Sequence, residues 1–101
     1  MPNHHEIKIR LAGGVSVETD ALPALRVGDT VHYSSPDGKA RVFFPSGSPF
    51  AISHVSDAEK HTVKTPGRFQ FQCFITPTGK TKEIGWTPEN PKAGGEHDVH
   101  S

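Results

Sequence analysis

The sequence is poor in large apolar residues and in cysteine, so it can build neither a large hydrophobic core nor a disulfide-linked one. It contains one cysteine, one methionine, one tryptophan and one tyrosine, and hydrophobic residues make up 33% of its 101 positions. A single cysteine excludes an intramolecular disulfide, so the fold must rely on packing alone. A chain of this length has room for one modest core and is too short for two domains.

Net charge and long hydrophobic runs are also absent. Lys and Arg total 11, Asp and Glu total 11, and the formal net charge is zero, so we expect no nucleic-acid or membrane partner. The hydrophobic runs are too short for a transmembrane helix, and residues 1–6 lack the basic and apolar regions of a secretory signal. We therefore expect a soluble, cytoplasmic protein from this chain, or a periplasmic or secreted one if a leader has been removed.

Turn residues are abundant and separate short segments in which apolar and polar residues alternate. The chain has ten glycines and nine prolines, and period-two alternation between such turns predicts strands. The predicted strands are 5–12, 15–18, 30–34, 39–45, 60–65, one within residues 65–79, and 81–86. We expect an all-β sandwich of about seven to eight strands over residues 1–86. Residues 87–101 have almost nothing to bury, which predicts an extended or disordered tail.

The clearest strand leads to the single cysteine. Within residues 65–79, Phe69, Phe71 and Cys73 occupy alternate positions, so their side chains share one face of the strand. Cys73 is therefore predicted to be a small buried hydrophobe. A reactive thiolate would need a neighbouring cation or imidazole, and the sequence places none next to it.

Two segments resemble the cupredoxin family of copper-binding β-sandwiches. Residues 27–38 (VGDTVHYSSPDG) are similar to the strand and turn before the family's first histidine ligand, and residues 63–73 (VKTPGRFQFQC) to the approach to its thiolate ligand. The resemblance covers about residues 27–86. It implies a cupredoxin-like, antiparallel or mixed Greek-key β-sandwich. An immunoglobulin-like sandwich, which shares the two-sheet architecture, is the alternative.

The same resemblance implies a copper centre of two imidazoles, one thiolate and an axial thioether. Only Cys73 is present among these ligands, because residues 39–42 contain no imidazole and residues 74–80 contain neither histidine nor methionine. We therefore expect no cofactor and no standard copper site. The alternative is copper or zinc bound at a non-standard site built on Cys73 with His54 and His61.

No catalytic constellation stands out, so we predict no enzyme activity and no catalytic residue. The remaining hypothesis is a non-catalytic binding or interaction module whose protein or small-molecule partner the sequence does not identify. Its predicted surface consists of Arg41, Phe50, Phe74, Pro77 and Lys80, at the end of the sandwich where the family holds its metal. The alternative function is a small copper-binding electron-transfer or metal-handling protein.

Four of the seven histidines lie near the ends of the chain, at His4, His5, His97 and His100. If Met1 is removed, the new amino terminus and His4 can chelate Cu(II) in a square plane. Copper binding in a titration can therefore originate from the ends of the chain and not from the fold.

Overall fold

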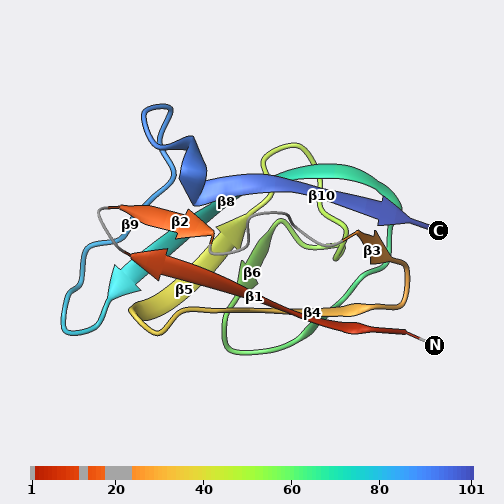
Figure 1. Ribbon diagram of the computed structural model, residues 1–101, viewed down its shortest axis with the longest axis horizontal. Coiled ribbons are helices and arrows are strands. Elements are labelled where there is room, and N and C mark those ends of the chain that lie inside the picture. Colours follow the sequence, from red (N-terminus) through yellow and green to blue (C-terminus); the bar gives the residue numbers. More distant parts are fainter. Residues whose placement is uncertain (1, 12–13, 18–23) are drawn as a thin grey trace.

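The computed structural model describes residues 2–11, 14–17 and 24–101 (Figure 1). These residues form ten strands in two mixed sheets, together with one 3-10 helix, η1 (Pro91–Ala93). The prediction of an all-β fold is confirmed. Positions 12 and 18, the last residues of two predicted strands, lie outside the described residues. No helix in the described part of the chain has the length and apolar character needed to cross a membrane.

The smaller sheet has the strand order β2-β1-β4-β7. Its strands are β1 (His4–Leu11), β2 (Val15–Val17), β4 (Thr30–Ser34) and β7 (His61–Thr62). β1 and β4 run parallel, with Ile7 opposite Tyr33, and both side chains are fully buried. The period-two pattern of β1 therefore directs its apolar side chains into the core, as its sequence predicts.

The larger sheet has the order β3-β10-β8-β5-β6, and β9 also pairs with β8. Its strands are β3 (Leu25–Arg26), β5 (Gly38–Phe43), β6 (His54–Ser56), β8 (Gly67–Pro77), β9 (Ile84–Gly85) and β10 (Gly94–His100). β8 is the longest strand and pairs antiparallel with β5, β9 and β10, whereas β10 and β3 are parallel. β10 pairs with residues 67–72 of β8 and β9 with residues 74–75, so the two strands follow one another along β8.

The two sheets enclose one hydrophobic core. β8 contributes Phe71, Cys73 and Ile75 to it, and the opposite sheet contributes Ile7 and Tyr33. Figure 1 shows β8 and β10 in one layer and β1 and β4 in the other, with both termini at one end of the molecule. The turn after β8 lies at the opposite end.

β10 overturns the prediction of a disordered tail over residues 87–101. Residues 94–100 form a strand between β8 and β3 in the larger sheet: residues 94–99 pair with β8, and Val99 and His100 pair with β3. Its inward positions are filled by His97 and Val99, and its outward positions by Glu96 and Asp98. A histidine at an inward position conceals the amphipathic pattern, which is why the segment was judged to have nothing to bury. The domain therefore continues past residue 86, and the chain has more strands than the seven to eight expected.

Candidate functional site

Cys73 lies in the middle of β8 with its thiol in the core. The residue is fully buried and faces Val42 of β5 across the ladder. Burial raises the pKa of the thiol well above its usual value, because the interior disfavours the charged thiolate. The prediction of a buried core cysteine is confirmed, and the thiol is protonated at neutral pH.

His54 projects away from Cys73. Val42 pairs with both Cys73 and Val55, so all three residues share the inner face of the larger sheet. His54 precedes Val55 and therefore points to the outer face, where its ring stacks on Phe43 at a centroid distance of 4.6 Å.

His61 lies on β7 in the other sheet. Its Nε2–H donates to the carbonyl oxygen of Ser56 at 3.0 Å, and its ring lies 5.7 Å from that of Phe50. Across the described ranges, no group of three or more His, Cys, Asp or Glu side chains is placed to hold a metal ion. The copper ligand set that the family resemblance implies thus does not fit the residues present.

The core contains a polar pair that the sequence analysis missed. Tyr33 Oη and His97 Nε2 lie 2.7 Å apart, and both residues are fully buried. The ring of Phe71 stacks on the imidazole at 4.6 Å, and Nδ1 of His97 has no hydrogen-bond partner in the described part of the chain. Burial lowers the pKa of His97 to about 4 and raises that of Tyr33, so both groups are neutral at pH 7. In the sequence, the alternation of His97 with Val99 could have indicated that His97 points inward from a strand.

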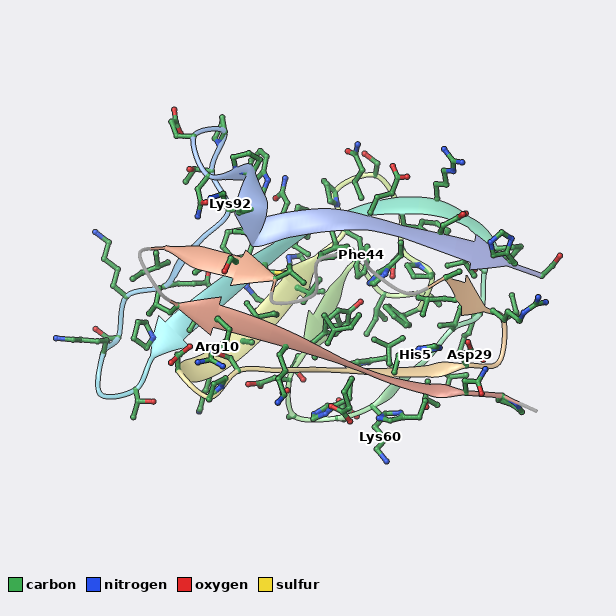
Figure 2. The ribbon with its side chains drawn as sticks, viewed as in Figure 1. His5, Arg10, Asp29, Phe44, Lys60 and Lys92 are labelled. Atoms are coloured by element: carbon green, nitrogen blue, oxygen red, sulfur yellow. The ribbon has the colours of Figure 1, made fainter. Side chains whose placement is uncertain are left out.

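Histidines of β1 and β4 form two clusters with the carboxylates of Glu6 and Asp29. The two carboxylate oxygens of Glu6 lie 2.6 Å from His4 Nε2 and 2.8 Å from His32 Nδ1. These hydrogen bonds lower the pKa of Glu6 and raise that of His32. His5 Nε2 lies 2.9 Å from Oδ2 of Asp29 (Figure 2). The same carboxylate accepts the backbone N–H of Arg26 at Oδ2 and that of Asn3 at Oδ1. His4 and His5 are therefore engaged within the fold.

The predicted partner surface is divided between two regions of the structure. On the outer face of the larger sheet, the guanidinium of Arg41 lies 4.4 Å from the ring centre of Phe74. Arg41 also donates to both carboxylate oxygens of Glu83, at 2.8 and 3.1 Å. This ion pair raises the pKa of Arg41 and lowers that of Glu83. Pro77 and Lys80 instead line a hollow of about 380 Å³ at the turn after β8.

Phe50 is not part of a surface, so its assignment to the partner site was wrong. The side chain is only 5% exposed and packs edge-on against Tyr33 and Phe44. The amide of Phe50 donates to Ser48 Oγ at 3.0 Å, and the following Ala51 has a φ of 68°, so the loop turns the ring inward. An exposed phenylalanine would leave a large apolar area in water, whereas this arrangement buries it.

A second hollow lies on the outer face of β8 and β10, and we call it the outer hollow. Its volume is about 350 Å³, and it is lined by Pro45, Gln70, Phe71, Gln72, Trp86, Gly95 and Glu96. Gln70 lies opposite Glu96 across the ladder and alternates with the buried Phe71. The side chains of Gln70, Gln72 and Glu96 make no hydrogen bond or ion pair with any described residue. These polar groups are therefore available to a ligand.

Trp86 forms one side of the outer hollow and is held there by close backbone contacts. The backbone N–H of Trp86 donates to the carbonyl oxygen of Cys73 at 3.0 Å. A Cβ at Gly85 would overlap the Phe74 ring, and a Cβ at Gly94 would lie 3.1 Å from Trp86 Cδ1. The two glycines thus allow the half-buried indole to lie against the sheet.

The geometry therefore favours the outer face of the larger sheet over the surroundings of Cys73. The outer hollow escaped the sequence analysis because one of its walls is β10, which was expected to be a tail. No protein-family model matches this sequence, and no curated protein matches it.

Proposed function

We propose that the chain is a cupredoxin-like domain without a standard copper site. Two parallel pairs, β1 with β4 and β3 with β10, support this fold, since immunoglobulin-like domains are built from antiparallel sheets. The segments that carry the resemblance, residues 27–38 and 63–73, contribute to β4 and β8. In this proposal the cupredoxin-like scaffold surrounds a thiol that is buried and protonated.

We propose further that this domain is a non-catalytic binding module and that its ligand occupies the outer hollow. The single observation that carries this proposal is the set of unpartnered polar side chains beside a half-buried tryptophan. Ligand sites typically combine apolar walls with a few polar groups that fix orientation, in volumes of roughly 300 Å³ or more. The outer hollow meets both conditions.

The lining of the outer hollow supports binding without catalysis. Among the described residues that line it, Glu96 is the one titratable group. General acid–base or nucleophilic catalysis needs an activated group with an oriented partner, and Glu96 has no such partner among the described residues. The proposed partner is therefore a small molecule that is bound and released unchanged.

A copper titration followed by visible absorption tests the copper-free part of the proposal. We expect Cu(II) to produce no intense charge-transfer band, because the Cys73 thiol is buried and His54 points to the opposite face of the sheet. The alternative function, a metal-handling protein with a Cys/His site, predicts such a band. An intense band that disappears in Cys73→Ser would contradict the proposal. Weak binding lost only in a His4→Ala/His5→Ala variant would originate from the amino-terminal end and support it.

A further inference from the structure

Building on the proposed binding function, we infer that the ligand of the outer hollow is a short neutral carbohydrate. The inference rests on three properties of the hollow: the planar polar groups that line it, the apolar surface beside them and the absence of a cation among the described lining residues.

The polar groups of the outer hollow match pairs of sugar hydroxyls. A glutamine amide presents a donor and an acceptor in one plane, and a carboxylate presents two acceptors. Gln70 and Glu96 lie directly opposite on neighbouring strands, which places their Cβ atoms about 5 Å apart. Adjacent hydroxyls of a pyranose ring each donate and accept, so two such planar groups can engage one face or edge of the ring together.

The apolar groups of the outer hollow match the C–H surface of the same ring. Trp86 and Pro45 line the hollow beside the glutamines. Tryptophan provides a large, rigid apolar area next to a wet polar surface, and one side of a pyranose ring exposes mainly C–H groups. The main chain of Trp86 is hydrogen-bonded to Cys73, and its indole lies over Gly94, where a Cβ would come within 3.1 Å of Cδ1. This packing limits the side-chain freedom that binding would remove.

Charge and backbone pairing argue against the other common ligand classes. Phosphates and nucleotides are bound through cations, yet no lysine or arginine is among the described residues that line the outer hollow. The nearby Arg41 is neutralised by Glu83. An extended peptide binds by adding to a free strand edge, but β8, the strand that carries both glutamines, is paired with β10 on one side and with β5 on the other. A neutral polyhydroxyl ligand satisfies all of these constraints.

Trp86 is the only tryptophan in the chain, so its fluorescence reports on the outer hollow directly. We propose titrations with cellotetraose, xylotetraose, maltotetraose and mannotetraose up to about 20 mM, which detects millimolar affinities. At least one of these saccharides is expected to give a saturable blue shift, because a bound ring displaces water from the indole. Gln72→Ala and Glu96→Gln should each weaken binding by about threefold to tenfold, the effect of one lost hydrogen bond.

Glu59→Gln is the matched control, because Glu59 is exposed and is not among the residues that line the outer hollow. It should bind the saccharide as the wild type does. The inference is overturned if no saccharide shifts the emission, or if Glu96→Gln and Glu59→Gln affect binding equally. A shift produced by ATP and by none of the saccharides would overturn it as well. These outcomes concern the ligand class only, whereas a Cys73-dependent copper band would refute the proposed function itself.

Discussion

The imidazole of His97 and the phenol of Tyr33 share a single hydrogen bond inside an otherwise apolar core. Each group would be costly to bury alone, and their mutual bond offsets part of that cost. Nδ1 of His97 remains without a partner among the described residues, which carries a penalty of about 1–3 kcal/mol. Stacking against Phe71 compensates in part. The arrangement requires a neutral imidazole.

This requirement predicts acid sensitivity. The pKa of His97 is about 4 in the folded protein, against about 6.5 for an imidazole in the unfolded chain. The unfolded state therefore takes up a proton first, and the free energy of unfolding decreases as the pH falls from about 6.5 to 4. The total loss approaches about 3 kcal/mol. Urea denaturation at pH values between about 7 and 4 measures it.

The control for this prediction is the double variant Tyr33→Phe/His97→Leu, in which both hydrogen-bonding partners are replaced by apolar groups. Glu6 and Asp29, whose pKa values are lowered, remain in both proteins, so their contribution cancels. Over the same pH range, the free energy of unfolding of the double variant should decrease less than that of the wild type. Equal slopes in the two proteins would show that His97 is not the titrating group.

Among the elements, β8 was predictable and β10 was not, for a physical reason. The inward positions of β8 are Phe71, Cys73 and Ile75, a pattern that only a half-buried strand explains. β10 buries His97 instead of an aliphatic residue, and its start is Gly94-Gly95, so neither hydrophobic periodicity nor β-propensity marks it. β6 was missed because it is three residues long and buries one side chain.

The candidate site likewise combines features that a local sequence pattern predicts with features that it does not. The burial of Cys73 follows from its own strand and was predicted correctly. The outer hollow requires β10 to lie beside β8, with Glu96 opposite Gln70, and no local pattern in either strand encodes that pairing. Phe50 was assigned to a surface because its loop has no period, whereas its burial is decided by contacts with Tyr33 and Phe44.

Native-state hydrogen exchange tests the position of β10. Residues 94–99 pair with β8 and residues 99–100 with β3, so the hydrogen-bonded amides of β10 should exchange with protection comparable to that of β8. Amides of residues 78–83, which follow β8 and lie mostly on the surface, should exchange orders of magnitude faster. Exchange of β10 at the rate of residues 78–83 would restore the tail interpretation and remove one wall of the outer hollow.

For the whole molecule, the two sheets separate two kinds of chemistry. The inner faces hold the protonated Cys73 thiol and the neutral Tyr33–His97 pair, which neither solvent nor a metal ion reaches in this arrangement. The outer face of the larger sheet presents unpartnered amide and carboxylate groups beside Trp86. The central claim of our proposal follows from this separation: the domain recognises ligands from its outer face, and the residue that resembles a metal ligand serves the core.

Chemical-shift mapping tests that claim most directly. The ¹⁵N-labelled protein is titrated with the four tetrasaccharides, ATP and Cu(II), and the amide and indole resonances are followed. We predict that saccharide-induced shifts centre on Gln70, Gln72, Trp86 and Glu96, while the resonance of Cys73 is unchanged by Cu(II). Saccharide- or ATP-induced shifts centred on Thr78 and Lys80, in the hollow at the turn after β8, or Cu(II)-induced shifts centred on Cys73, would contradict this claim, whereas the absence of any saccharide-induced shift would overturn the carbohydrate as the ligand.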